Sequence, residues 1–396
     1  AIMSVLPRLC SSASSKFVLL AIPFFILSGN VMEKAGISGR LINLAEKCLG
    51  HIRGGMAMVC VVVSCFFAAI SGSGPATVAA LGLIMIPALV KAGYPASFSC
   101  ALMAAGGAIG VVIPPSITSL VYGSIAAASI TDLFVAGVVP GLLMGLGLIV
   151  AAMLMGRRMD LKVLPKASGK ERLAAFKDAF WGLLMPVIIL GGIYGSVFTP
   201  TEAAAVSVFY GLIVGVFIYR EVKWKDMGEL LVDSGKTTGG IMLIIGAATL
   251  FAYICTIHGI SQAAQGLLLD IAGNKIVFLL IVNVIFLIAG CFVDANSAMY
   301  IFIPIMYPVA QQLGIDLVHF GVLSTVNLAI GQVTPPVGVN LFVAIGVADK
   351  LQGLKDKTKV TIASMSKAVW PMILACVITL LVVTYVPFFS TVFLKG

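Results

Sequence analysis

The sequence has little charge and few of the residues from which soluble enzymes build their active sites. Asp, Glu, Lys and Arg make up 10% of the 396 residues, and there are three histidines and three tryptophans. Soluble domains carry about a quarter charged residues, so this composition excludes an ordinary soluble protein. The eight cysteines are scattered and form no Cys-x-x-Cys pair. They are therefore predicted to be small buried side chains rather than disulfides or metal ligands.

Apolar residues dominate the chain: 60% of it is hydrophobic and the mean hydropathy is +1.12. A helix that crosses the hydrocarbon core of a bilayer needs about 20 apolar residues. Runs of this order occur at 17–32, 55–91, 97–130, 133–156, 180–198, 199–219, 238–257, 275–312, 320–348 and 369–394. The sequence predicts an all-α polytopic membrane protein in contact with membrane lipid. The net charge of +9 then reflects membrane topology and not nucleic-acid binding.

The basic residues are concentrated in a few connections between these runs. Together with Lys91, four segments hold 21 of the 25 Lys and Arg: 33–54, 157–179, 220–237 and 349–368. Basic connections favour the cytoplasmic face. They share that face only if the runs 55–91 and 275–312 each enter and leave the membrane on one side. We therefore predict two re-entrant helical hairpins, with the C-terminus outside.

An internal repeat is visible in the sequence. "AIGVVIPP" at 108–115 returns as "AIGQVTPP" at 329–336, with six of eight positions identical at an offset of 221. "KAGIS" at 34–38 similarly corresponds to "IHGIS" at 257–261. The predicted topology places the two copies in opposite orientations in the membrane. Inverted repeats of this kind are typical of secondary transporters.

The paired prolines of the repeat predict two broken transmembrane helices. Proline removes a backbone donor and clashes with the preceding turn, so each run becomes two half-helices. Backbone groups freed at such a break are tolerated in lipid only where they are buried or line a cavity. A purely structural proline kink is the alternative, but two breaks in matching positions favour a functional site.

The tips of the predicted hairpins contain short polar residues between apolar flanks. The first tip reads "SGSGPAT" (71–77) and the second "DANSAM" (294–299). Their hydroxyl, amide and carbonyl oxygens suit hard cations. Asp294 is an acid at membrane depth, which is usually functional, although Asp294 or Ser297 could instead cap a helix. "TPTE" at 199–202 is a capping box with Pro200 at the first helical position, which predicts a helix start and not a substrate site at Glu202.

At this point the motifs resemble a known family, the large membrane subunit of tripartite ATP-independent periplasmic (TRAP) transporters. The resemblance covers nearly the whole chain. It rests on "AIPFFILSGNVM" (21–32), "SGSGPATVAALG" (71–82), "IPPSI" (113–117), "FTPTEAAAV" (198–206) and "TPPVGVNLFVA" (334–344). It implies an elevator-type importer in the bacterial inner membrane, coupled to Na⁺, for a small organic acid anion such as a C4-dicarboxylate or sialic acid. The implied partners are a small membrane (Q) subunit and a periplasmic substrate-binding (P) protein.

The resemblance also implies site residues, because in the family sodium binds where hairpin tips meet broken helices. The corresponding sodium positions are Ser71, Gly72, Ser73, Gly74, Thr77, Gly110, Ile113, Pro114, Ser116, Asp294, Asn296, Ser297, Gly331, Thr334, Pro335 and Gly338. The corresponding substrate positions are Ser73, Pro115, Asn296, Pro336 and Asn340. No Lys or Arg lies in the predicted core of a run. The anion would thus be balanced by half-helix N-termini and sodium.

The expected organisation is a first repeat (1–156), a cytoplasmic basic loop (157–179) and a second repeat with a preceding scaffold (180–396). The first repeat divides into arm 17–54, hairpin 55–91, broken helix 97–130 and helix 133–156. The second divides into scaffold 180–219, arm 238–274, hairpin 275–312, broken helix 320–348 and C-terminal helix 369–394. The family has a further N-terminal helix, expected to be absent here or to lie outside this sequence. Runs 133–156 and 180–219 are the expected seat of the small subunit.

Three other functions fit parts of the pattern. Ser73 could be the nucleophile of an intramembrane protease, but the three histidines fall in or beside loops and no G-x-S-x-G elbow exists. A channel could use re-entrant hairpins, although inverted repeats favour alternating access. A sodium-driven anion transporter that acts without a binding protein is the closest alternative.

The topology can be tested with cysteine labels. A cysteine at Lys170 or Lys357 is expected to react with a membrane-impermeant thiol reagent only from the cytoplasmic face, because both lie in basic connections. A cysteine at Gln265 should react only from outside. Labelling of positions 170 and 265 from the same side would contradict the inverted arrangement.

Overall fold

The computed structural model describes residues 7–9, 11–12, 15–351 and 360–394, and all regular structure in these ranges is helical. The elements are η1 Phe17–Leu20, α2 Ala21–Lys34, α3 Ile37–Leu49, α4 Gly55–Ser71, α5 Gly74–Lys91, α6 Ala96–Val112, α7 Ile117–Ala126, α8 Ile130–Gly156, α9 Gly169–Tyr194, α10 Pro200–Ile213, η2 Val214–Ile218, η3 Trp224–Asp226, α11 Met227–Ile257, α12 Ile260–Ala272, α13 Lys275–Phe292, α14 Ala295–Gln312, α15 Leu317–Gly331, α16 Val339–Lys350, α18 Ile362–Tyr385 and α19 Phe388–Thr391. Within the described ranges, nine helical stretches are long and apolar enough to cross a membrane. The predicted all-α polytopic architecture is confirmed.

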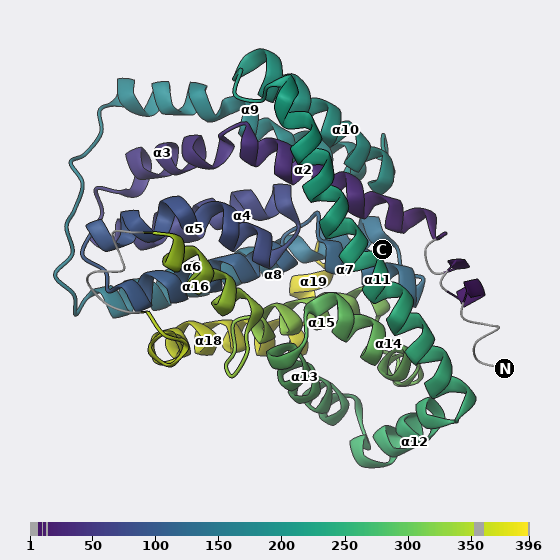
Figure 1. The fold of residues 1–396 in the computed structure, drawn as a ribbon. Coiled ribbons are helices and arrows are strands. Elements are labelled where there is room, and N and C mark those ends of the chain that lie inside the picture. Colours follow the sequence, from purple (N-terminus) through teal and green to yellow (C-terminus); the bar gives the residue numbers. More distant parts are fainter. Residues whose placement is uncertain (1–6, 10, 13–14, 352–359, 395–396) are drawn as a thin grey trace.

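The first predicted hairpin consists of α4 and α5, whose outer ends lie on the same side of the molecule. Just before α4, the Gly50 carbonyl accepts a hydrogen bond from Leu164 N (3.1 Å). Just after α5, the Ala92 carbonyl accepts one from Lys162 N (2.9 Å). Both ends are thus bonded to the connection between α8 and α9, which runs along the left of Figure 1.

The second predicted hairpin consists of α13 and α14, and its outer ends lie beside the C-terminal segment. The Tyr385 hydroxyl donates to the Ile276 carbonyl (3.4 Å) at the start of α13. Beyond the end of α14, His319 Nδ1 lies 2.6 Å from Ser390 Oγ. In Figure 1, α12 and α14 lie toward the right, away from the α8–α9 connection on the left. Inverted repeats require this arrangement, and the repeat relationship itself remains a prediction.

Both broken helices are interrupted at the predicted prolines. The first is α6 followed by α7, with 113–116 between them, and the second is α15 followed by α16, with 332–338 between them. All residues of α6 except Ser97, and all residues of α15 except Leu317 and Val318, are buried, and these three are half-buried. These half-helices therefore form the centre of the bundle.

Several boundaries differ from the predictions made from hydropathy. The arm 17–54 is two helices, α2 and α3, separated at Gly36, and the arm 238–274 is split in the same way at Gly259. The basic segment 157–179 is not entirely a loop, because α9 begins at Gly169 behind a capping box of Ser168 and Glu171. Polar helical turns extend beyond the apolar part, and hydropathy does not detect them.

The remaining differences have the same cause. The basic segment 220–237 contains the start of α11 at Met227, and α18 begins at Ile362, before the apolar run 369–394. The run 180–219 is two helices, and α10 begins at Pro200 with the predicted Thr199–Glu202 capping box. Residues 352–359 of the last basic segment, with Lys357, lie outside the described residues, as do 1–6, where the first repeat was predicted to begin.

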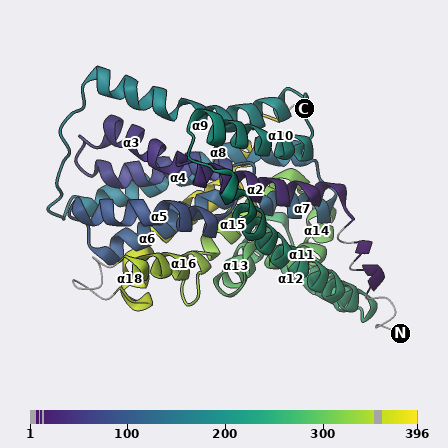
Figure 2. The same cartoon turned by 45° about the horizontal axis from the view of Figure 1, so that its top comes forward.

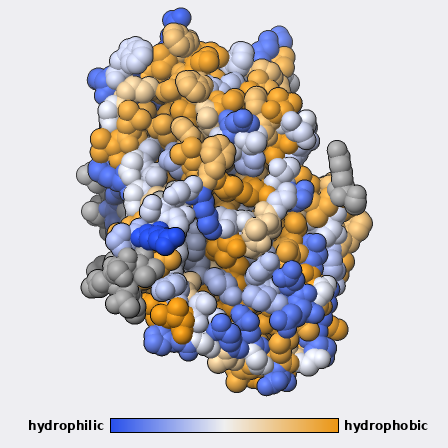
Figure 3. All heavy atoms as spheres, turned by 90° about the vertical axis from the view of Figure 1, so that its right-hand side faces the viewer, coloured by the Kyte–Doolittle hydropathy of each residue, from blue (hydrophilic) through white to orange (hydrophobic). Residues whose placement is uncertain are grey.

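The peripheral helices surround the hairpins and broken helices unequally. In Figures 1 and 2, α9 and α10 form an outer layer, and α11 runs obliquely across the bundle to α12. On α8, Leu142, Leu146, Val150 and Leu154 follow one face at four-residue intervals and are 49–58% exposed. Such a stripe faces lipid. The end face seen in Figure 3 instead mixes hydrophilic and hydrophobic side chains.

The two halves of the chain pack closely where Gly321 of α15 meets Tyr122 of α7. The Tyr122 hydroxyl donates to the Leu317 carbonyl (2.7 Å). A Cβ added at Gly321 would lie 2.4 Å from Tyr122 Cε1 and 2.7 Å from Leu133 Cδ2. The tyrosine ring is fully buried and has no room to move aside.

Gly321→Ala is therefore expected to destabilise the protein by about 1–3 kcal/mol through overpacking. The measurement is the midpoint of thermal unfolding in detergent. Gly346→Ala, on a helix where an added Cβ meets nothing within 4 Å, is the matched control and should leave the midpoint unchanged. Equal midpoints for the two variants would contradict the close approach.

Candidate functional site

The first hairpin tip is docked onto the first helix break. Gly72 has φ +60° and ends α4. Its carbonyl accepts a hydrogen bond from Ile117 N (3.2 Å), the first residue of α7. A Cβ on Gly72 would lie 2.6 Å from the Pro115 carbonyl oxygen. Only glycine therefore permits both the turn and this close contact.

This docking gathers three oxygen atoms. Ser71 Oγ lies 2.8 Å from Thr77 Oγ1, and the Thr77 hydroxyl donates to the Ser73 carbonyl (2.8 Å). A Cβ on Gly110 would lie 2.7 Å from Thr77 Oγ1 and 2.9 Å from Ser73 O. Ser71 and Thr77 are buried. We call these atoms, Ser71 Oγ, Ser73 O and Thr77 Oγ1, the first oxygen cluster.

The rest of the first break is buried and internally bonded. Ser116 caps α7, accepting from Ser119 N (3.2 Å), and its hydroxyl donates to the Val111 carbonyl. The intervening residues Ile113, Pro114 and Pro115 are also buried. Of the predicted sodium residues in this repeat, the structure brings together Ser71, Gly72, Ser73, Thr77 and Gly110. Ser116 is instead hydrogen-bonded to α6 and α7 on either side of the break.

The second tip is organised differently. Asp294 is the N-cap of α14: its carboxylate accepts from Asn296 N (3.0 Å), Ser297 N (3.2 Å) and the Ser297 hydroxyl. The capping alternative for Asp294 is therefore confirmed. Within the described residues its hydrogen bonds all lie in its own turn. Asn296 points elsewhere, accepting through Oδ1 from Thr118 Oγ1 of α7 (3.1 Å).

The second break meets its hairpin through backbone atoms. Gly338 N donates to the Cys291 carbonyl (3.1 Å), and a Cβ on Gly331 would lie 2.5 Å from Gly290 Cα. The Thr334 hydroxyl donates to the Ile330 carbonyl (2.8 Å), so it is engaged within its own helix end. The carbonyl oxygens of Thr334 and Gln332 face Gly338, 3.1 and 3.3 Å from where its Cβ would lie. Of the break prolines, Pro335 is half-buried and Pro336 is exposed.

The two halves of the chain meet at Gly74, where α5 begins. A Cβ on Gly74 would lie 2.6 Å from Gln332 Oε1 and 3.2 Å from Asn340 Oδ1. Both amide oxygens are buried without a hydrogen-bond partner. Asn340 Nδ2 donates to the Ala104 carbonyl (3.2 Å) on α6. Two acceptors without donors therefore converge on the positive end of a helix.

Gln332 and Thr118 were not among the predicted site residues. Gln332 could have been found, because it occupies the position of Val111 in the repeated motif and, with Thr334 in place of Ile113, is one of its two polar departures. Thr118 has no such signal. Its contact with Asn296 joins residues 178 positions apart, and a sequence repeat does not reveal that pairing.

The first tip is reached by a cavity between α2 and α11. A cavity of about 90 Å³ is lined by Ser71 and Ser73 together with Asn30, Glu33 and Thr237. The last three also line a wider opening of about 450 Å³, which extends to Lys34 and Asp233. The first tip is thus open toward the side of the basic segments 33–54 and 220–237.

The comparison with protein families identifies the family of this chain. Residues 2–389 match the model of the family described as the DctM component of tripartite ATP-independent periplasmic transporters. The chain belongs to this family of TRAP transporter large permease components. The family is one of transporter permeases and not of enzymes. With its nine apolar stretches among the described residues, this DctM-family chain is a multi-pass inner-membrane protein.

Several relatives of the DctM family align over most of the chain. The C4-dicarboxylate TRAP transporter large permease protein of Pseudomonas aeruginosa is 43% identical over 94% of this chain and 85% of its own length. The sialic acid TRAP transporter large permease protein of Vibrio cholerae is 37% identical over 94% and 85%. The isethionate TRAP transporter permease protein of Oleidesulfovibrio alaskensis is 45% identical over 96% of this chain, which spans 58% of that relative.

Solved structures share the fold of this DctM-family chain. The Alcanivorax borkumensis YdaH transporter superposes with a TM-score of 0.67 over 97% of this chain and 87% of that one, at 15% identity. Neisseria gonorrhoeae MtrF gives 0.67 over 97% and 84%, at 14% identity. At these identities the likeness concerns the fold alone.

The direction of the opening yields a test. Ser73→Cys in a cysteine-free protein is expected to react with a membrane-impermeant thiol reagent added on the side of Lys34, because the cavity at Ser73 opens there. Ala108→Cys, on the fully buried α6, is the matched control and should not react from either side. Reaction of Ser73→Cys only from the opposite side would contradict the opening described here.

Proposed function

We propose that this chain is the transport component of a sodium-coupled importer for a small organic acid anion, working by an elevator movement of its hairpin core. The observation that carries the proposal is the first oxygen cluster, held between a hairpin tip and a helix break. Three relatives are named for C4-dicarboxylate, sialic acid and isethionate transport. The three named substrates are all organic acid anions. Because the three relatives have similar sequence identity to this chain, they favour this substrate class and do not single out one anion.

The donor set of the first cluster fits sodium. It consists of two hydroxyls and a carbonyl, and hard cations prefer such oxygens. Within the described residues no group of three His, Cys, Asp or Glu side chains could hold a metal ion. A donor set of two hydroxyls and one carbonyl, without a carboxylate, suits a weakly held monovalent cation that must bind and leave in every cycle. At the second break, the carbonyls of Gln332 and Thr334 face Gly338 and are the corresponding candidates.

An organic acid anion would be balanced by helix N-termini. The N-termini of α5 and α7 lie side by side, joined by the Ile117–Gly72 hydrogen bond. Each carries about half a positive charge from its unpaired N–H groups. No Lys or Arg side chain is placed at the tips or breaks. Sodium bound beside these N-termini would supply the remaining positive charge, so anion binding would depend on sodium.

The transport cycle requires the site to face each side of the membrane in turn. We assign the movement to the hairpins and the broken helices, whose half-helices α6 and α15 form the buried centre. We assign the fixed frame to α9 and α10. Exposed aromatic side chains on α9, Phe176, Phe180 and Trp181 (37–44% exposed), make this frame a seat for the small membrane (Q) subunit. A periplasmic substrate-binding (P) protein would deliver the anion to the opposite side from the basic segments.

The sodium assignment predicts a graded defect. Thr77→Val removes the hydroxyl that bonds both Ser71 Oγ and Ser73 O, and loss of one buried ligand costs about 1–3 kcal/mol. The sodium concentration for half-maximal uptake should therefore rise about ten-fold. The measurement is anion uptake into proteoliposomes that contain the Q subunit, with the P protein added outside.

Thr77→Ser keeps the hydroxyl and is the matched control, with a sodium curve close to that of the unmodified protein. Potassium replaces sodium as the ion control. Uptake by the unmodified protein that runs equally well in potassium would refute sodium coupling. Uptake that needs no P protein would favour the stand-alone transporter instead.

A further inference from the structure

Each half of the chain contains an elbow between two helices, at a glycine in the left-handed conformation. Gly36 (φ +72°) separates α2 from α3, and Gly259 (φ +69°) separates α11 from α12. They occupy the same place in "KAGIS" and "IHGIS". The two elbows therefore have the same backbone geometry, and their surroundings can be compared residue by residue.

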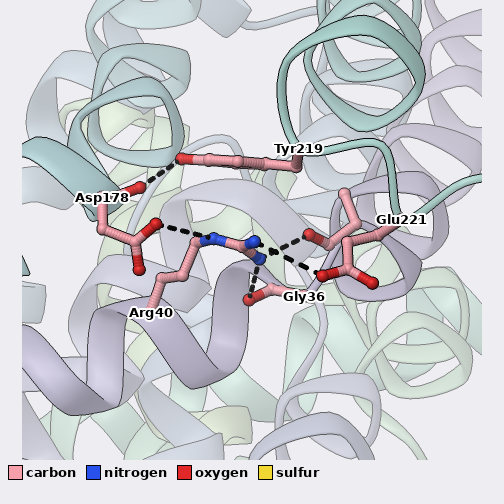
Figure 4. A network of polar contacts seen from close by, with 6 residues as sticks. Gly36, Arg40, Asp178, Tyr219 and Glu221 are labelled. Atoms are coloured by element: carbon pink, nitrogen blue, oxygen red, sulfur yellow. Dashed lines mark hydrogen bonds and ion pairs between the residues drawn. The ribbon is translucent and has the colours of Figure 1, made fainter.

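The first elbow is closed by Arg40, one turn into α3. Its Nη1 donates to the carbonyls of Ala35 (3.0 Å) and Gly36 (3.1 Å). Ala35 is the C-cap of α2, where carbonyls lack helical partners, and the Gly36 carbonyl also accepts the first backbone hydrogen bond of α3 from Arg40 N (3.4 Å). A cation at the C-terminal end of a helix is also favoured by the helix dipole. Figure 4 shows the guanidinium directly beside the Gly36 carbonyl.

The same guanidinium is bonded to the outer layer of the molecule. Nε donates to Asp178 Oδ1 of α9 (3.2 Å), and Nη2 lies 3.5 Å from Glu221 Oε1, between η2 and α11. The guanidinium carbon lies 3.9 Å from the centre of the Tyr219 ring, and the Tyr219 hydroxyl donates to the Asp178 carbonyl (2.7 Å). Figure 4 shows these contacts around one side chain.

These contacts act together. A single half-exposed ion pair contributes little to stability, but the planar guanidinium holds several partners at once and stacks on an aromatic ring. A second pair, Lys47 Nζ with Glu171 Oε1 (3.3 Å), joins α3 to α9 further along. The first elbow and α3 are thus attached to α9 at two places.

The second elbow has none of these contacts. The residue that corresponds to Arg40 is Ala263. A Cβ on Gly259 would meet nothing within 4 Å, whereas one on Gly36 would lie 2.7 Å from Arg40 Nη1. In the part of the chain that the structure describes, no ion pair involves α12.

We propose that the two elbows have different mechanical roles: Arg40 fixes the first elbow to α9 and the 219–221 segment, while Gly259 is a free hinge for α12 and the second hairpin. Arg40 is a positioning residue, since it acts through α3 and touches neither tip nor break. The purpose of the asymmetry rests on the proposed transport function, because a core that moves against a frame needs one fixed and one flexible attachment. The difference in mobility itself does not depend on sodium or substrate.

Pulsed electron-resonance distances between spin labels test the mobility directly. One pair, Asn43→Cys with Lys177→Cys, reports α3 against α9, and the other, Lys236→Cys with Asp270→Cys, reports α11 against α12. Both are placed in a cysteine-free protein in lipid nanodiscs. The first distance distribution is expected to be narrow and the second broad. Arg40→Ala should broaden the first, Arg40→Lys should do so partially, and Lys166→Ala, which removes an exposed cation elsewhere, should not.

A first distribution as broad as the second, or one that Arg40→Ala leaves unchanged, would overturn the proposal. Both distance distributions can be interpreted whether or not uptake depends on sodium. The proposal about the elbows and the proposed transport function can therefore fail separately. Uptake per folded protein supplies the functional half of the test. Gly259→Ala should slow it about five-fold, because alanine disfavours a left-handed backbone. Gly314→Ala, also at positive φ (+66°) with open space around it, is the matched control. Equal uptake in both glycine variants would refute the hinge.

Discussion

The interrupted helices must find partners for their own backbone groups, because lipid offers none. In both halves the partner is the hairpin of the same half. Gly72 O accepts from Ile117 N, and Gly338 N donates to Cys291 O. The docking distances are short enough that glycine is required at the contact, as the 2.6 Å approach of a Gly72 Cβ to Pro115 O shows. The positions of the hairpins, the breaks and the cavity all follow from this pairing.

The oxygen atoms of the candidate site are a consequence of that docking. The turn at Ser71–Gly74 places the Ser71 hydroxyl and the Ser73 carbonyl beside the Thr77 hydroxyl of α5, and the Ser73 carbonyl also accepts from Thr77 N (3.1 Å). The Ser73 carbonyl and the Thr77 hydroxyl face the Gly110 backbone. The amide oxygens of Gln332 and Asn340 then meet the N-terminus of α5 from the other half. A neutral site bounded by helix ends avoids burying a fixed cation, which would be costly at membrane depth. In the proposed transport cycle, sodium would supply the positive charge that the side chains do not.

The two halves share a backbone plan and differ in side chains at a few decisive places. Gln332 stands where the first half has Val111, so a buried amide exists on one side only. Ala263 stands where the first half has Arg40, so one elbow is bonded and the other is free. The two halves therefore differ in side chains at the second helix break and at the elbow, although their helices follow the same order.

Hydropathy, basic connections and paired prolines were sufficient to predict from the sequence the hairpins, the broken helices and the Thr199–Glu202 cap, because these depend on local backbone chemistry and on immersion in lipid. The same signals misplaced the starts of α9 and α11, since polar turns can be helical outside the hydrocarbon. They also left the role of Asp294 open between ligand and cap. Only the tertiary structure decided that Asp294 caps α14, that Asn296 meets Thr118 and that Arg40 joins three segments. The reason is physical: such contacts form between residues far apart in the chain and require separations of about 3 Å, which packing of the whole bundle determines.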